Sequence, residues 1–123
     1  MTNLIVCCDG TWNTPEQEDN GQLAPTNVFK LHGALAEYDS DGVPQVSYYR
    51  EGVGTSGNAI KRLLGGSLGV GLSNDIKSAY KWLCDNYDPA TSRVFLFGFS
   101  RGAFTVRSMA GLIGRYGILN HDH

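Results

Sequence analysis

VFLFGFSRGAF (residues 94–104) is the stretch of the sequence that decides the fold. An apolar run over residues 93–99 leads into a serine held between two glycines, and an amphipathic pattern follows. Apolar runs of this kind are typical of strands buried on both faces in a parallel sheet. We therefore predict a strand over 93–99 that turns at Ser100 directly into a helix over 103–117.

The rest of the chain alternates strand and helix patterns in the same way. LIVCCDG (residues 4–10) is another continuous apolar run, and QVSYY (residues 45–49) carries the β-branched and aromatic residues typical of strands. Apolar residues at spacings of three and four predict one helix capped by Thr26 or Asn27 and a second helix near residues 70–87. The order β-α-β-α-β-α predicts an α/β fold, in which right-handed crossovers join the strands of a parallel sheet.

The composition fits one compact domain over residues 1–123. The formal charge is −2 and the basic residues are scattered rather than clustered, so we expect no nucleic-acid partner. No apolar run approaches the ~20 residues that span a bilayer, and the N-terminus, MTNLIVCCDGTWN, lacks the basic region of a secretory signal. These features predict a protein synthesised in the cytoplasm without a signal peptide or a transmembrane segment.

The three cysteines indicate reduced thiols rather than a disulfide or a metal site. Cys7 and Cys8 are neighbours in a predicted strand, where successive side chains point to opposite faces. Cys84 makes the count odd, and no second cysteine pair exists to complete a metal cluster. We therefore predict buried, reduced thiols in a reducing compartment, with no metal ion and no cofactor.

The serine between glycines matches the G-x-S-x-G pattern of a nucleophile elbow, in which a sharp strand-to-helix turn raises the hydroxyl above the sheet. Ser100 would be the catalytic nucleophile. Gly98 and Gly102 would be glycine because side chains there collide with the adjoining strand and helix. The backbone N–H of Arg101, at the positive end of the following helix, would bind the oxyanion. The alternative is a serine in a tight turn that caps the helix.

Three other patterns compete with this interpretation. GGSLG (residues 65–69) also matches G-x-S-x-G, but the preceding NAIKRLL does not predict a strand. GVGTSG (residues 52–57) matches a dinucleotide-binding loop, yet it follows the second strand and the candidate ribose-binding acid, Asp75, falls in a helix. We interpret it as a glycine loop. CDGT resembles an aspartate-phosphatase signature, but Cys7 stands where that signature has its nucleophile.

The loop after the first strand is a candidate for the other half of the oxyanion hole. In α/β-hydrolases the second oxyanion N–H comes from a loop after a strand adjacent to the elbow strand. If LIVCC is that strand, DGTWN (residues 9–13) is the loop, and Gly10, Thr11 or Trp12 presents the donor. This assignment predicts the strand order 2-1-3, with both loops at the carboxyl edge of the sheet. Asp9 fits an Asx-turn that bonds its own backbone at least as well as a catalytic role.

A serine nucleophile also needs a base within hydrogen-bond reach and a carboxylate that orients this base. His32 lies inside the first predicted helix, where we interpret it as a structural residue, and His121 lies in the C-terminal NHDH. Asp122 and His123 follow the order Ser…Asp…His, but adjacent residues at a frayed chain end are poor substitutes for a preorganised pair. We therefore expect Ser100 to be positioned as a nucleophile and yet to react slowly.

Five segments resemble, in order and spacing, the catalytic domain of the type VI lipase effectors and their uncharacterised bacterial relatives. They are CDGTWN, PTNVFKL, YYREGVGT, GLSNDIKSAYKWLCDNY and VFLFGFSRGAFTVRSMAGLI. The resemblance covers nearly the whole chain, and it implies an α/β-hydrolase fold, a Ser-Asp-His triad, phospholipase activity against membrane lipids and contact-dependent delivery from a bacterial cell. It transfers Ser100 as the nucleophile and no further residue, because the family's acid and histidine come from later sequence.

The resemblance further implies that this three-layer, hydrolase-like sheet is incomplete. The chain would then be the N-terminal portion of a single domain: a fragment, a truncated product, or a half that needs a partner. Two functions remain open. The chain carries the nucleophile of a serine esterase or phospholipase with a lipid or ester substrate, or it is a non-catalytic remnant that binds a partner or lipid. Apolar faces left exposed by the missing half predict self-association as a homodimer.

Overall fold

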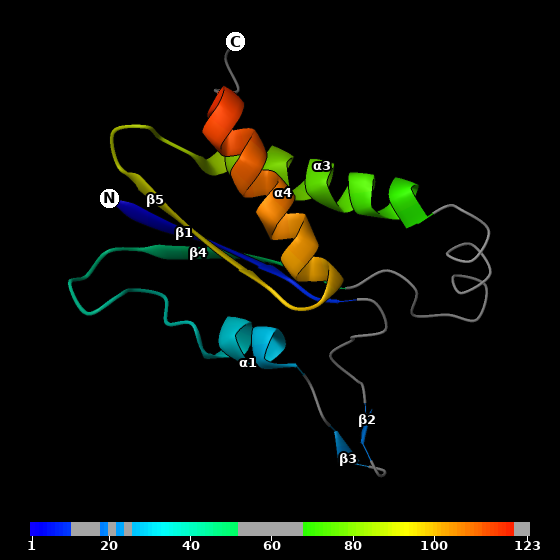
Figure 1. Ribbon diagram of the computed structural model, residues 1–123. Coiled ribbons are helices and arrows are strands. Elements are labelled where there is room, and N and C mark those ends of the chain that lie inside the picture. The colour runs from blue at the N-terminus through cyan, green and yellow to red at the C-terminus, as the bar shows by residue number, and fades with distance from the viewer. Residues whose placement is uncertain (11–17, 20–21, 24–25, 52–67, 120–123) are drawn as a thin grey trace.

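The computed structural model describes residues 1–10, 18–19, 22–23, 26–51 and 68–119. Within these residues the chain forms a sheet of three strands between two helical layers (Figure 1). The strands of this sheet are β1 (Thr2–Cys8), β4 (Gln45–Arg50) and β5 (Ser92–Gly98). The helices are α1 (Asn27–Ala34), α3 (Leu68–Asn86) and α4 (Arg101–Tyr116). A short antiparallel pair, β2 (Glu18–Asp19) and β3 (Gln22–Leu23), follows β1 and precedes α1 in the chain.

The sheet is parallel and its strand order is β4-β1-β5, which confirms the predicted α/β fold and the order 2-1-3. Helix α1 contacts β1 and β4 from one face, and α3 and α4 cover the other face (Figure 1). The register pairs Cys8 of β1 with Arg50 of β4 and with Gly98 of β5. The three strands therefore end level with one another, and the loops that follow them share the carboxyl edge of the sheet.

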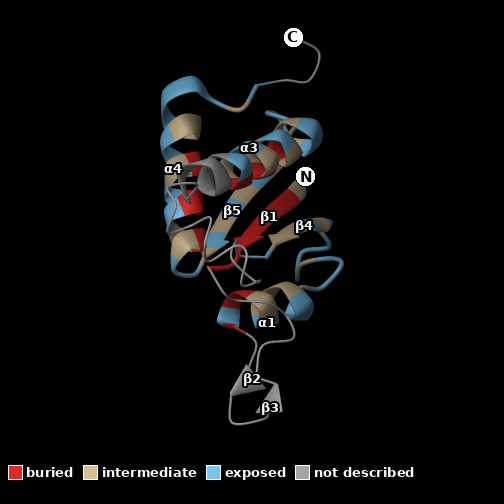
Figure 2. Ribbon diagram, turned by 90° about the vertical axis from the view of Figure 1, so that its right-hand side faces the viewer, coloured by how far each residue is buried: buried red, intermediate tan, exposed pale blue. Residues whose placement is uncertain are grey.

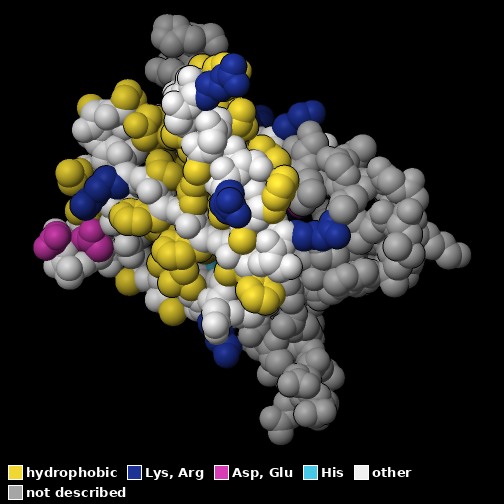
Figure 3. All heavy atoms as spheres, in the orientation of Figure 1, with side chains coloured by type: hydrophobic (Ala, Val, Ile, Leu, Met, Phe, Trp, Pro, Cys, Tyr) yellow, Lys and Arg dark blue, Asp and Glu magenta, His cyan; other side chains and the backbone are white. Residues whose placement is uncertain are grey.

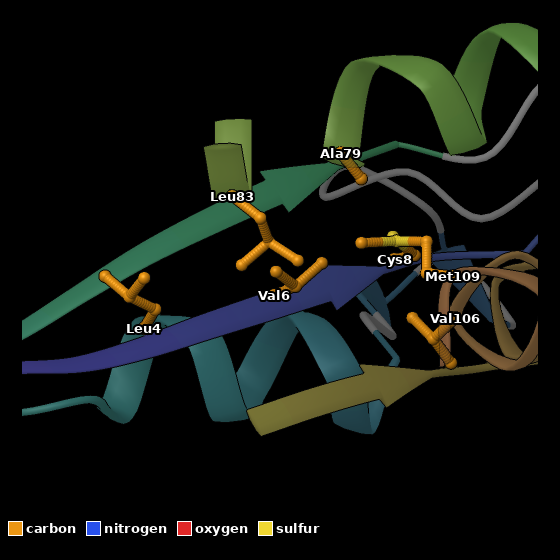
Figure 4. Packing of buried hydrophobic residues seen from close by; sticks show 7 residues of the cluster. All are labelled: Leu4, Val6, Cys8, Ala79, Leu83, Val106 and Met109. Atoms are coloured by element: carbon orange, nitrogen blue, oxygen red, sulfur yellow. The ribbon is translucent and has the colours of Figure 1, made fainter. Parts of the chain in front are cut away.

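Strand β1 lies at the centre of the core and is buried along nearly its whole length (Figure 2). Alternate residues of β1 meet apolar side chains of α3 and α4 on one face of the sheet. This cluster consists of Leu4, Val6, Cys8, Ala79, Leu83, Val106 and Met109 (Figure 4). On the other face Ile5 and Cys7 pack against Val28 of α1. The two adjacent cysteines thus point to opposite faces, as their positions in the strand predict.

All three thiols are free. Cys7 and Cys8 are buried, whereas Cys84 is half-buried. Desolvation, reinforced by nearby acidic groups, raises the pKa of Cys7 from 9.0 to about 11 and that of Cys8 from 9.0 to about 12. Raised thiol pKa values contribute stability that is fully present below about pH 9 and is lost as the pH rises toward 11 to 12. We expect the free energy of unfolding to fall with increasing pH in this window.

The same burial predicts the order in which the thiols react. At pH 8 in the native protein, half-buried Cys84 should react first with a disulfide reagent such as dithionitrobenzoate, and Cys7 and Cys8 should react only slowly. In denaturant all three should react at similar rates. Fast native reaction of Cys7 or Cys8 would contradict the packing of β1.

Candidate active site

The turn between β5 and α4 has an unusual backbone conformation at Ser100. The residue adopts φ 56° and ψ −116°, and among the described residues it is the one non-glycine residue with positive φ. This conformation is sparsely populated by L-residues, and such strain costs about 1–3 kcal/mol and gathers at functional sites. The turn is fixed on both sides, because the N–H of Phe99 donates to the carbonyl of Cys8 in β1 (3.1 Å) and helix α4 begins at Arg101.

Ser100 does not use its hydroxyl to cap helix α4. The residue occupies the N-cap position, yet its side chain makes no capping hydrogen bond. Its carbonyl oxygen, by contrast, accepts from the N–H of Ala103 (3.0 Å) and of Phe104 (3.3 Å), which starts the helix. A capping serine was the alternative interpretation of the sequence pattern, and this geometry disfavours it. The exposed hydroxyl is left available to a ligand.

The glycines on either side of Ser100 lie where no Cβ fits. A Cβ added at Gly98 would come within 3.0 Å of backbone atoms of Gly102 and Ala103 in α4. A Cβ added at Gly102 would come equally close to the carbonyl groups of Cys8 and Asp9. These contacts are with backbone, which cannot move aside as a flexible side chain can. The first turn of α4 therefore packs directly on the ends of β1 and β5.

The loop that follows β1 lies beside this turn. Asp9 and Gly10 come directly after β1 and are both buried. The close approach of Gly102 to the carbonyl of Asp9 places them at the same edge of the sheet as Ser100. The residues that continue this loop, including the candidate oxyanion donors Thr11 and Trp12, lie outside the described residues. Gly10, which follows Asp9, and Arg101, which follows Ser100, thus both belong to loops that begin at this edge of the sheet.

The carboxylate of Asp9 is held by two side chains from distant parts of the chain. The hydroxyl of Thr26 donates to it, at 2.7 Å from Oδ1 and 2.9 Å from Oδ2, and the hydroxyl of Tyr49 donates to Oδ2 at 2.5 Å. The Thr26 hydroxyl in turn accepts from the N–H of Phe29 (3.1 Å) and caps α1. Asp9 therefore joins β1, α1 and β4. The sequence pattern did not predict these partners, although Thr26 belongs to PTNVFKL, one of the segments that carry the family resemblance.

Removal of the Thr26 hydroxyl is expected to destabilise the protein by about 2 kcal/mol, because it removes both a helix cap and a hydrogen bond to a buried carboxylate. Thr26→Val should lower the free energy of unfolding in urea by this amount. Thr26→Ser keeps the hydroxyl and should therefore keep most of the wild-type stability. Thr91→Val is a matched control, since Thr91 is exposed in the turn before β5. An equal effect of Thr26→Val and Thr91→Val would contradict the role given to this network.

A charged pair lies at the end of β4. Arg50 Nε donates to Oδ1 of Asp75 in α3 at 2.5 Å, and Asp75 is buried. Burial alone would lower the pKa of Arg50, but hydrogen bonds to Asp75 and Tyr48 raise it overall. Asp75 therefore ties α3 to β4, and this pairing supports the interpretation that it is not a ribose-binding acid.

The histidines give no described base for Ser100. His32 lies in α1 and stacks on the ring of Tyr49, with ring centroids 5.2 Å apart. His121 and His123, together with Asp122, lie outside the described residues, as do GVGTSG and Ser67. Among the residues that the structure describes, no group of histidine, cysteine and acidic side chains is arranged to hold a metal ion.

An open groove of about 500 Å³ lies apart from this edge, between α3 and α4. It is lined by Ile76, Ser108, Gly111, Leu112, Arg115 and Tyr116. None of these residues belongs to the turns at the carboxyl edge of the sheet. We therefore place the candidate site at Ser100 and not in this groove.

A comparison with protein families matches residues 2–123 to the catalytic domain of the Tle1-like phospholipase effectors of the type VI secretion system. The chain belongs to this family. A second comparison shows that this Tle1-like chain is 36% identical, over 131 residues, to the uncharacterised protein YEL023C of Saccharomyces cerevisiae. That alignment covers 96% of this chain and 18% of the yeast protein, so the chain spans less than a fifth of its relative's length. No solved structure matches the chain at a significant level. In the described part of the Tle1-like chain, no helix is both long and apolar enough to cross a bilayer.

Proposed function

We propose that this chain carries the nucleophile of a serine hydrolase that cleaves a carboxylic ester of a phospholipid. The observation that carries the proposal is the backbone of Ser100, a strained non-glycine residue at positive φ whose side chain makes no capping hydrogen bond, at the junction of a parallel strand and a helix. The substrate class comes from membership of a phospholipase effector family. Delivery by cell contact, as for a secreted effector, belongs to the same proposal.

In this mechanism the Ser100 Oγ attacks the ester carbonyl carbon and gives up its proton to a base. The oxyanion that forms accepts hydrogen bonds from the N–H of Arg101 and from a donor in the loop after β1, at Gly10 or Thr11. Collapse of the intermediate breaks the ester C–O bond, and the lysophospholipid alcohol leaves with the proton. Water then hydrolyses the acyl-serine and releases a fatty acid. Gly98 and Gly102 allow the close packing that aims α4 at the oxyanion.

Mass spectrometry of the products from phospholipid vesicles tests this assignment. Attack on a carboxylic ester releases a fatty acid and a lysophospholipid, whereas attack on the phosphodiester releases diacylglycerol or phosphatidic acid. We expect only the first pair, and we expect it to disappear in Ser100→Ala but not in Ser108→Ala, a control serine in the same helix. Vesicle binding without either product pair would instead support the non-catalytic alternative.

A further inference from the structure

The side chain of Arg101, which follows Ser100 in the chain, is half-buried and lacks a partner. Its Nη1 is shut off from solvent, and no described residue accepts a hydrogen bond from it. A buried donor without an acceptor is costly, and such a group in a native structure calls for an explanation. The mechanism proposed above uses only the backbone N–H of this residue. The guanidinium is therefore a buried cation with no role in that mechanism.

The acidic side chains near this edge of the sheet already have other partners. Asp9 accepts hydrogen bonds from two hydroxyl groups, and Asp75 is paired with Arg50. Within the part of the chain that the structure describes, Arg101 forms no ion pair. The charge of Arg50 is thus matched by a carboxylate, whereas that of Arg101 is not.

The backbone directs the Arg101 side chain toward the site of the proposed reaction. The Cα atoms of Ser100 and Arg101 are about 3.8 Å apart, because the two residues are adjacent. Side chains on a helix tilt toward its N-terminus, and α4 begins at Arg101, at the carboxyl edge of the sheet. Gly102 fixes the helix there, since it packs against the carbonyl groups of Cys8 and Asp9. The guanidinium therefore stays within reach of a ligand whose ester lies at Ser100.

The surface around α4 suits an anionic ligand. On the face that Figure 3 shows, Lys and Arg side chains are spread among apolar ones, whereas Asp and Glu side chains gather at one end of the view. Helix α4 itself contains three arginines, at positions 101, 107 and 115, and no acidic residue. A positively charged surface of this kind attracts anions to the site.

We propose that the Arg101 guanidinium binds the phosphodiester of the phospholipid whose ester Ser100 attacks. This inference rests on the proposed function and adds the group that selects the substrate. Only glycerol carbons and their oxygens separate the ester carbonyl from the phosphorus, so one lipid molecule can contact Ser100 and Arg101 together. The planar fork of guanidinium donors matches phosphate oxygens, which supply the acceptor that Nη1 lacks. A neutral glyceride offers the same ester without an anionic acceptor, so Arg101 makes the site selective for phospholipids.

Ligand binding to the Ser100→Ala chain tests this inference without turnover. Isothermal titration compares dihexanoyl phosphatidylglycerol with dihexanoylglycerol, which lacks the phosphate, and with inorganic phosphate. We expect the phospholipid to bind at least about tenfold more tightly than either of the others, because hydrogen bonds to charged groups are strong. Arg101→Gln in this background should bring the affinities for the two lipids close to each other. Arg107→Gln is the matched control, because Arg107 is exposed on the same helix and its charge is screened by solvent.

A second measurement leaves the arginine in place. Phenylglyoxal modifies arginine side chains, and mass spectrometry gives the rate at Arg101 and at Arg107 separately. Dihexanoyl phosphatidylglycerol should slow the modification of Arg101 but not that of Arg107, and dihexanoylglycerol should slow neither. This result would support the inference even if Arg101→Gln does not fold.

The inference would be overturned if the phospholipid does not bind, or if both lipids bind equally well to the chain that retains Arg101. An equal loss of both lipids in Arg101→Gln would show that the guanidinium does not bind the phosphate. Inorganic phosphate that binds as tightly as the phospholipid would assign the site to a free anion. Fatty acid release that requires Ser100 would uphold the proposed hydrolysis even then, whereas phosphate-dependent lipid binding without fatty acid release would uphold the Arg101 site and refute the hydrolysis.

Discussion

Replacing Ser100 by glycine is expected to stabilise the fold and to remove the hydrolytic activity proposed for this chain. Glycine adopts φ 56° without the strain that a Cβ imposes, and relief of about 1–3 kcal/mol is partly offset by the greater freedom of glycine in the unfolded chain. The free energy of unfolding should therefore rise by about 1 kcal/mol. Release of fatty acid should fall to the background rate, because no nucleophilic oxygen remains.

Ser100→Ala separates these two effects. Alanine keeps the Cβ and therefore the strain, so its stability should equal that of the wild type within about 0.5 kcal/mol, while its activity should be lost as in Ser100→Gly. Urea unfolding and the lipid assay measure the two quantities on the same preparations. If Ser100→Gly and Ser100→Ala unfold at the same urea concentration, the turn at Ser100 is not strained. If Ser100→Ala retains the wild-type activity, the serine is not the nucleophile.

Replacing Gly102 by alanine is expected to destabilise the protein by at least about 2 kcal/mol. The added Cβ would meet the carbonyl groups of Cys8 and Asp9, so relief requires that α4 move away from the end of β1. The displacement would also shift the N–H of Arg101. The proposed release of fatty acid should therefore fall together with the stability. Urea unfolding monitored by circular dichroism measures the first effect.

Gly111→Ala supplies a control within the same helix. Nothing lies within 4 Å of a Cβ at Gly111, so alanine there should stabilise α4 by about 0.5–1 kcal/mol through its higher helix propensity. The two substitutions are chemically identical and should have opposite signs. Equal effects at Gly102 and Gly111 would show that α4 does not pack on β1 as described.

The sequence pattern predicted the parts of the site that are local in the chain. The turn at Ser100 could be predicted because VFLF, the two glycines and the amphipathic helix pattern are contiguous in the sequence. The strand order was predicted by assigning the first and third strands to the central part of a hydrolase sheet, where the strand before the serine turn neighbours the strand before the proposed oxyanion loop. The turn follows from local backbone geometry, whereas the strand order follows from the likeness to a hydrolase sheet.

The contacts that support the site from a distance were not predictable in this way. Asp9 bonds to Thr26, 17 residues later, and to Tyr49, 40 residues later, and no periodicity links these positions. The pair of Arg50 with Asp75 likewise depends on where α3 crosses β4. The exposure of Phe97 could not be predicted for a different reason. The composition of β5 suits burial on both faces, and composition alone does not show which elements cover a strand.

The catalytic role of Ser100 is tested most directly by its rate of reaction with a fluorophosphonate probe, measured at each serine by mass spectrometry in native and in urea-unfolded protein. Oriented backbone donors should speed attack in the folded chain even where the base is weak, since one such donor changes rates by about 10²–10³. We predict that Ser100 is labelled at least about 100-fold faster in the native protein than in the unfolded protein, and that Ser108 is not. Equal rates in both states, or native labelling spread evenly over Ser100 and Ser108, would contradict the assignment of Ser100 as the nucleophile.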